Sequence, residues 1–203
     1  MIKLGVLISG NGTNLVAIQE AIEAKKLDAS IELVISSRPK AKGLKRAHDM
    51  GLQTMSLSSD IYDLRPSAAD EIIASMMRQN EVDYIVMAGY MRKVGEVILK
   101  AFPDRVLNLH PALLPSFPGA HAIEQTWLSG VKVAGVTVHF ANEAYDQGPI
   151  IAQRAIEVPE GASLGELEEL IHAEEHKLYP EVLQLLAEDK VKIMGDRTVR
   201  IFY

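Results

Sequence analysis

The chain opens with a nearly continuous apolar run, Ile2–Ile8, which stops at the turn-forming residues Ser9–Gly12. A short apolar run bounded by turn residues is typical of a strand that is covered on both faces. The next segment, Asn14–Lys26, carries apolar residues three and four positions apart, a spacing that predicts a helix with one apolar face. A buried strand followed by such a helix is the repeating unit of a parallel sheet.

The same alternation continues along the chain. Further strands are expected at Ile31–Ser36, Leu52–Leu57, Tyr84–Ala88, Arg105–Leu109, Val131–Phe140 and Ile150–Val158, and a strand pair at Lys192–Phe202. Further helices are expected at Lys42–Met50, Ser67–Gln79, Val94–Ala101, Ala122–Ser129 and Leu164–Leu186. The pattern predicts an α/β fold with a doubly wound, mostly parallel, Rossmann-like sheet and helices on both faces. Residues 1–203 are expected to form a single domain, since a domain has about 100–200 residues.

Composition narrows the function classes. With 27 acidic and 21 basic residues the net charge is -6, which argues against a general nucleic-acid binder, because phosphate contacts need a surplus of cations. The chain has no cysteine, and therefore no disulfide, thiolate zinc site or cysteine nucleophile. The first apolar run is too short to span a membrane and lacks the features of a signal peptide. We therefore expect a cytoplasmic protein with no membrane partner.

The loop Ser9–Asn14, with the sequence SGNGTN, lies between a predicted strand and a predicted helix. Unpaired N–H groups and the positive end of the helix dipole make such a position suitable for an anion, and glycines let the anion approach the backbone. The loop lacks the Gly-Lys-Ser/Thr ending of a P-loop and the third glycine of the dinucleotide fingerprint. It is either a phosphate site or a tight turn in which Thr13 or Asn14 caps the helix.

Asn108 and His110 end a predicted buried strand and are two positions apart, so they are expected on one face. An amide donor beside an imidazole suits a reaction in which a carbonyl becomes an oxyanion. Asp146, before a Gly-Pro turn, is a candidate carboxylate that would favour the charged imidazole. Taken singly, each residue also has an ordinary interpretation: a structural histidine at a strand end, or an aspartate that shapes a turn.

Five segments together resemble the phosphoribosylglycinamide formyltransferase family of purine synthesis. They are Ser9–Asn14, Ala88–Arg92 (AGYMR), Leu107–Pro115 (LNLHPALLP), Phe117–Gly119 (FPG) and Asp146–Pro149 (DQGP). They occur in the family's order over nearly the whole chain. The resemblance implies the formyltransferase fold, no metal, and transfer of a formyl group from 10-formyltetrahydrofolate to the amine of 5-phosphoribosylglycinamide in de novo purine (IMP) biosynthesis.

The resemblance also implies roles for single residues. Asn108 and protonated His110 would stabilise a tetrahedral oxyanion, with Asp146 raising the basicity of His110 and helping to move a proton. Gly12, Thr13 and Asn14 would hold the substrate phosphate. Glu175 would bind the ribose hydroxyls, although it could equally be a solvated charge beside Glu174. The folate would lie along Met91, Arg92, Lys93 and Val94, with contributions from Asn108 and Arg65, although an exposed arginine is ordinarily a surface residue.

Three residues depart from the family pattern: Lys93, Gln147 and His172. Gln147 is compatible with its loop if it does not need a positive φ angle. His121 and His139 resemble positions near the family's site, but each could simply be a hydrogen-bonded structural histidine, and no role is expected for them. The expected partners are small-molecule substrates, and the protein is expected to be a monomer or a homodimer.

Alternative functions remain open at this point. A related formyltetrahydrofolate hydrolase, or a formyltransferase with another acceptor, would use the same three catalytic residues. A relative acting on transfer RNA would be expected to have a basic surface, whereas this chain is acidic. A non-catalytic nucleotide-binding module is a third possibility, because a fold does not imply a function.

Overall fold

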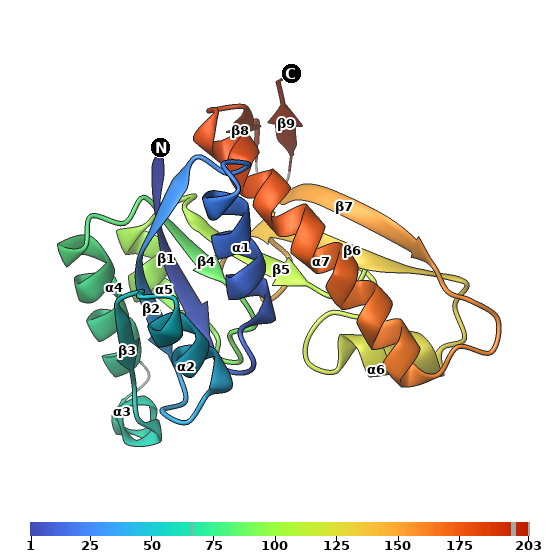
Figure 1. The fold of residues 1–203 in the computed structure, drawn as a ribbon, viewed down its shortest axis with the longest axis horizontal. Coiled ribbons are helices and arrows are strands. Elements are labelled where there is room, and N and C mark those ends of the chain that lie inside the picture. Colours follow the sequence, from blue (N-terminus) through green and yellow to red (C-terminus); the bar gives the residue numbers. More distant parts are fainter. Residues whose placement is uncertain (66, 196–197, 203) are drawn as a thin grey trace. The chain divides into compact units, whose positions relative to one another are not determined.

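The computed structural model describes residues 1–65, 67–195 and 198–202, whose helices and strands are labelled in Figure 1. Contacts within the chain divide it into two compact units, and the division falls between Asn108 and Leu109. The prediction that residues 1–203 form a single domain stays a prediction.

The first unit contains the parallel strands. They are β1 (Ile2–Ile8), β2 (Ala29–Ser36), β3 (Thr54–Ser56), β4 (Tyr84–Met87) and β5 (Val106–His110), the last of which continues past the division. The helices are α1 (Thr13–Glu23), α2 (Lys42–Asp49), α3 (Ser59–Leu64), α4 (Ala68–Gln79) and α5 (Glu96–Ala101). β1 pairs in parallel with both β2 and β4, β2 pairs with β3, and β4 pairs with β5.

β1 lies at the centre of this unit because its side chains are covered on both faces. Leu4, Val6, Leu7 and Ile8 are fully buried. A Cβ atom at Gly5 would lie only 2.1 Å from the sulfur of Met77, so the glycine allows α4 to pack closely on the strand. The continuous apolar run in the sequence therefore corresponds to a buried strand, as predicted.

The second unit is built on an antiparallel strand pair, β6 (Val133–Phe140) and β7 (Ile150–Glu157). Its helices are α6 (Ala122–Leu128) and α7 (Leu164–Ala187), and its last strands are the antiparallel pair β8 (Val191–Ile193) and β9 (Val199–Ile201). α7 begins at a capping box, in which Ser163 and Glu166 satisfy each other's backbone N–H groups. This cap and nine buried side chains stabilise the longest helix of the described chain.

The strand order is β3-β2-β1-β4-β5-β6-β7. The predicted α/β fold with a mostly parallel sheet is confirmed, and each predicted strand and helix has a counterpart in the structure. β3 is shorter than predicted, and α3 was missed because it has six residues and none of them is buried. Residues 196–197 of the predicted terminal strand pair lie outside the described residues.

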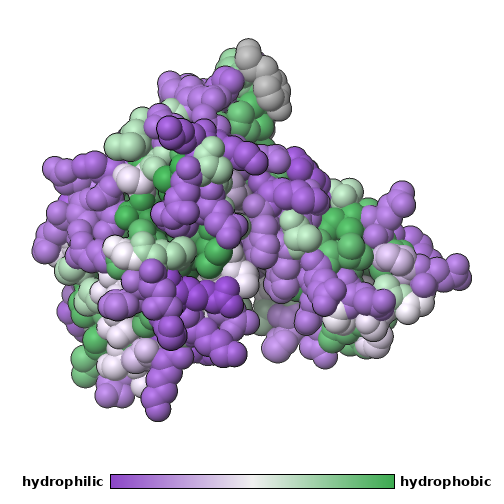
Figure 2. All heavy atoms as spheres, viewed as in Figure 1, coloured by the Kyte–Doolittle hydropathy of each residue, from purple (hydrophilic) through white to green (hydrophobic). Residues whose placement is uncertain are grey.

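The face drawn in Figure 2 is mostly hydrophilic, with apolar side chains in separate patches. Among the described residues, no helix is both long and apolar enough to cross a membrane.

Candidate active site

The glycine loop connects β1 to α1 in the first unit. Gly12 is the N-cap residue of α1, with φ at +72°, and a Cβ there would lie 2.7 Å from the Cα of Gly43. The N–H of Gly43 donates to the carbonyl oxygen of Gly10 at 3.0 Å, so the start of α2 supports the loop. Since the N-cap is a glycine, the alternative in which Thr13 or Asn14 caps the helix is wrong. α1 has no side-chain cap hydrogen bond, and the role of Gly12, Thr13 and Asn14 as a phosphate site stays a prediction.

The segment Met91–Val94 follows β4 and precedes α5. Met91 is 70% exposed and Val94 is buried. Arg92 and Lys93 are exposed, and the guanidinium carbon of Arg92 lies 4.6 Å from the centre of the Tyr62 ring. The charged Lys93 therefore occupies a solvent-facing position, where a departure from the family pattern leaves the core unchanged.

Arg65 has partners of its own in the structure. Its guanidinium donates to both carboxylate oxygens of Glu71, at 2.8 and 2.5 Å, and to the hydroxyl of Ser67. To contact a folate, Arg65 would have to exchange this bidentate pair for the ligand. Its predicted role in folate binding stays a prediction.

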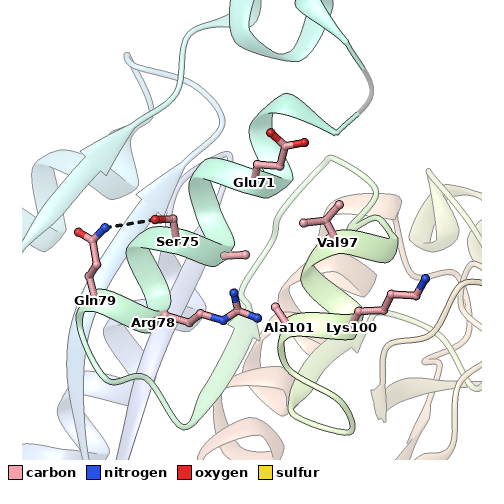
Figure 3. A pocket seen from close by; sticks show the side chains of 8 residues that line it. Glu71, Ser75, Arg78, Gln79, Val97, Lys100 and Ala101 are labelled. Atoms are coloured by element: carbon pink, nitrogen blue, oxygen red, sulfur yellow. Dashed lines mark hydrogen bonds between the residues drawn. The ribbon is translucent and has the colours of Figure 1, made fainter.

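Glu71 also borders a shallow hollow of about 550 Å³ between α4 and α5, which Figure 3 shows from close by. Its lining residues are Glu71, Ala74, Ser75, Arg78, Gln79, Val97, Lys100 and Ala101. No predicted site residue belongs to this set. The hollow is therefore not the predicted site.

His110 and Asp146 are brought together within the second unit. Nδ1 of His110 lies 3.4 Å from Oδ2 of Asp146, and the two side chains are 5% and 2% exposed. Nε2 of His110 lies 2.8 Å from the carbonyl oxygen of Phe117, which can only accept a hydrogen bond. Each ring nitrogen of His110 therefore faces an oxygen that can accept a hydrogen bond.

Asp146 has two further partners. The N–H of Gly119 donates to its Oδ2 at 2.8 Å, and Nε2 of His139 lies 3.7 Å from its Oδ1. Burial is the largest influence and raises the pKa of the Asp146 carboxyl, but the interaction with His139, the Gly119 N–H and the charges of His110 and His139 together hold this pKa below its usual value. Asp146 is therefore a carboxylate at neutral pH, despite its burial.

His139 is the residue of this cluster to which the sequence assigned no role. It is 2% exposed, and its Nδ1 lies 2.9 Å from the carbonyl oxygen of Phe140. The signal in the sequence was an imidazole near the end of an otherwise apolar buried strand. Such a group needs partners, although the sequence does not identify Asp146 as one of them.

The loop between β6 and β7 fixes the backbone of Asp146. The N–H of Gln147 donates to the carbonyl oxygen of Ala144, and the N–H of Phe140 to that of Pro149. The positive φ angle falls on Asp146, at +52°, and not on Gln147. Gln147 therefore needs no positive φ angle, which was the condition for its fitting this loop. Asp146 shapes the turn, and this is compatible with a chemical role for its side chain.

Asn108 lies two positions before His110 in β5, where it is half-buried and pairs in register with Met87 of β4. Alternation along the strand gives both residues the same face. The sequence expectation for this pair therefore agrees with the strand that the structure describes.

Glu175 lies in α7 and is 4% exposed, so the alternative of a solvated charge is wrong. Its Oε2 lies 2.9 Å from Nδ1 of His172, one turn earlier in the helix. The hydrogen bond from Glu175 is the largest influence on the His172 pKa and raises it above the usual value, against the opposing effect of burial. His172, one of the three departures from the family pattern, is thus paired with Glu175. Glu174, by contrast, pairs with Arg154 and Lys177.

No group of three or more His, Asp or Glu side chains in the described part of the chain is arranged to hold a metal ion.

The sequence pattern of the formyl transferase family matches residues 2–183. The chain belongs to the formyl transferase family. A phosphoribosylglycinamide formyltransferase of Bacillus subtilis (strain 168) is 41% identical over 186 residues, covering 92% of this chain and 95% of the relative. The crystal structure of glycinamide ribonucleotide transformylase 1 from Symbiobacterium toebii has a TM-score of 0.96 and 45% identity, over 100% of this chain and 95% of that one.

A more distant member of the fold is a formyltetrahydrofolate deformylase from Pseudomonas syringae. It has a TM-score of 0.91 at 23% identity and covers 100% of this chain and 66% of that one. This likeness concerns the fold alone.

Proposed function

We propose that the protein transfers the formyl group of 10-formyltetrahydrofolate to the amine of 5-phosphoribosylglycinamide, a step of de novo purine (IMP) biosynthesis. The observation that carries the proposal is the buried pair of His110 and Asp146, in a chain 41% identical to a phosphoribosylglycinamide formyltransferase. A carboxylate that stays ionised beside an imidazole favours the protonated form of that imidazole. The resulting cation can stabilise a negative charge that develops on the substrate.

The chemistry is assigned to three side chains. When the amine attacks the formyl carbon, negative charge builds up on the formyl oxygen. The amide of Asn108 and the imidazolium of His110, whose Nε2–H exchanges the carbonyl oxygen of Phe117 for the substrate, donate hydrogen bonds to this oxygen and lower the energy of the transition state. Asp146 favours the cationic form of His110 through its opposite charge and accepts the surplus amine proton, directly or through water. This proton passes to N10 of the folate as the bond between N10 and the formyl carbon breaks, and tetrahydrofolate leaves.

Substrate binding is assigned to the glycine loop, to Glu175 of α7 and to the segment Met91–Val94. Gly12, Thr13 and Asn14 hold the phosphate with backbone N–H groups at the start of α1, supported by the helix dipole. Glu175 accepts hydrogen bonds from the ribose hydroxyls. The folate binds along Met91–Val94, with Asn108 near its formyl group and Arg65 toward its acidic tail. Both substrates are small molecules, and no metal takes part.

The test follows loss of the formyl donor by absorbance, with the purified protein, 10-formyltetrahydrofolate and 5-phosphoribosylglycinamide. We expect turnover that depends on the acceptor and continues in the presence of a chelator. Turnover without the acceptor would instead identify a formyltetrahydrofolate hydrolase. Binding of both ligands without turnover would identify a non-catalytic module, and would refute the roles given to Asn108, His110 and Asp146.

A further inference from the structure

The segment Met91–Val94 has no regular secondary structure, so other contacts must set its conformation. Its first residue is held by Ser9. The N–H of Met91 donates to the hydroxyl oxygen of Ser9 at 2.8 Å, and the two residues are 82 positions apart in the chain. Ser9 is 1% exposed, and its hydroxyl also shares a 2.6 Å hydrogen bond with that of Ser37 at the end of β2.

The far end of the segment is held by Asp70, in the first turn of α4. The N–H of Gly95 donates to Oδ2 of Asp70 at 2.8 Å. A Cβ at Gly95 would lie 2.3 Å from the same oxygen, so the glycine allows this close approach. Asp70 is 7% exposed, and its burial raises the pKa of the carboxyl, while the Gly95 N–H opposes that rise. A carboxylate retained in a buried position needs such a partner.

Between these two ends, Arg92 lies over the ring of Tyr62, whose hydroxyl is 2.8 Å from that of Tyr90. Neither the Ser9 contact nor the Asp70 contact involves the backbone of Arg92 or Lys93. The segment is thus fixed at both ends by buried side chains, while its middle stays exposed to solvent.

We propose that Ser9 and Asp70 are positioning residues that hold Met91–Val94 in the conformation that receives the folate. This inference rests on the proposed function, since it assumes that the folate binds there. A segment fixed before the ligand arrives loses less conformational freedom on binding, and this lowers the dissociation constant.

The two residues differ in what else they hold. Ser9 is also the first residue of the glycine loop, and its hydroxyl links that loop to Ser37, directly after β2. Loss of its hydroxyl is therefore expected to disturb both the folate segment and the phosphate loop. The described hydrogen bond of the Asp70 carboxylate is with Gly95, at the end of the folate segment, so its loss is expected to affect the formyl donor and leave the acceptor unchanged.

The experiment measures kcat and the KM of each substrate for Ser9→Ala, Asp70→Ala and Asp70→Asn in the full chain. For Asp70→Ala we expect the donor KM to rise about tenfold, the factor for loss of roughly 1.4 kcal/mol, with the acceptor KM unchanged. Asp70→Asn removes the same negative charge from α4 as Asp70→Ala does, but it keeps an oxygen that can accept the hydrogen bond from the Gly95 N–H. It should therefore restore the donor KM. For Ser9→Ala both KM values should rise.

Two control variants separate positioning from general loss of stability. Asp83→Ala removes a carboxylate that accepts a backbone N–H at the same distance, 2.8 Å from the nitrogen of Lys3. Ser36→Ala removes a buried serine hydroxyl that bonds to the backbone of Arg38. Both controls should lower the melting temperature and leave the donor KM unchanged.

An unchanged donor KM in Asp70→Ala, or a donor KM that rises equally in Asp83→Ala, would overturn the inference. Absence of turnover in the unmodified protein would instead refute the proposed function. In that case, isothermal calorimetry with 5-formyltetrahydrofolate, a stable folate, still tests the positioning role. Weaker binding by Asp70→Ala than by Asp70→Asn would support it, and equal binding would overturn it.

Discussion

Nδ1 of His110 and Oδ2 of Asp146 lie 3.4 Å apart in surroundings that exclude nearly all solvent from both side chains. The pair is 36 positions apart in the chain and is assembled by the loop between β6 and β7. The carboxylate of Asp146 is the charged member of the pair. Its role can be tested by a substitution that removes the charge and keeps the shape of the side chain.

Asp146→Asn is expected to lower kcat by about 10²–10⁴-fold, the usual contribution of a positioned acid–base group. The amide cannot stabilise the imidazolium of His110 or accept the amine proton. Steady-state kinetics with both substrates gives the number. Asp189→Asn is the matched control, because Asp189 also has a positive φ angle but is exposed and pairs with Lys192. Equal activity in the two variants would remove Asp146 from the mechanism.

The same carboxylate should control stability in acid. Its pKa in the folded protein lies below the usual 3.8, so it stabilises the fold above that value, and the stabilisation is lost as the pH falls through the folded pKa. Between pH 5 and pH 3 the free energy of unfolding should therefore fall less in Asp146→Asn than in the unmodified protein. Urea denaturation at several pH values measures the free energy of unfolding of both proteins. If this free energy falls with pH equally in both, the lowered pKa of Asp146 is contradicted.

His172 should show the opposite pH dependence. Its pKa is raised above 6.5 by Glu175, so the pair stabilises the fold fully below 6.5 and this contribution is lost as the pH rises through the folded pKa. The stability difference between the unmodified protein and His172→Gln should thus shrink above neutral pH. The imidazole can also be titrated by NMR, and a midpoint at or below 6.5 would refute the pairing.

Glu175 and its neighbour Glu174 offer a paired test of substrate binding. Glu175→Gln is expected to raise the KM for 5-phosphoribosylglycinamide by about tenfold, because a neutral amide is a weaker acceptor for the ribose hydroxyls. Glu174→Gln should leave this KM unchanged and lower stability slightly, since Glu174 pairs with Arg154 and Lys177. A KM that changes equally in both variants would indicate a general charge effect.

Gly148→Ala tests the support of the catalytic loop. A Cβ at this position would lie 1.7 Å from the carbonyl oxygen of Phe140, so the backbone must move. We expect a loss of about 2–4 kcal/mol in stability, with lower kcat, because Asp146 is two residues away. In Gly165→Ala the new Cβ meets nothing within 4 Å in α7, and this variant should gain up to about 1 kcal/mol. Thermal unfolding distinguishes them.

The elements with strong periodicity could be predicted from the sequence, and those that depend on distant contacts could not. β1 and α7 were clear because a continuous apolar run and a long amphipathic pattern each have one interpretation. α3 carries no buried residue and so leaves no apolar pattern. The bond of Ser9 to Met91 spans 82 positions and joins two motifs whose contact leaves no pattern in the sequence.

The site shows the same division. Asn108, His110 and Asp146 could be proposed from motifs, because an imidazole, an amide and a carboxylate in an ordered set indicate a reaction. The burial of Glu175 and the contact of His139 with Asp146 could not be seen, since both depend on how the second unit packs. The partner of His172 could have been anticipated, because residues three apart on a helix are neighbours.

Asp146 holds its carboxylate on a backbone with φ at +52°, a conformation that only glycine, asparagine and aspartate adopt with ease. Of these three residues, aspartate alone carries a charge. During evolutionary drift, the two replacements that fold most readily at this position are the ones expected to abolish the reaction. Either replacement would thus remove the charge that the reaction needs while leaving the backbone conformation of this loop in place.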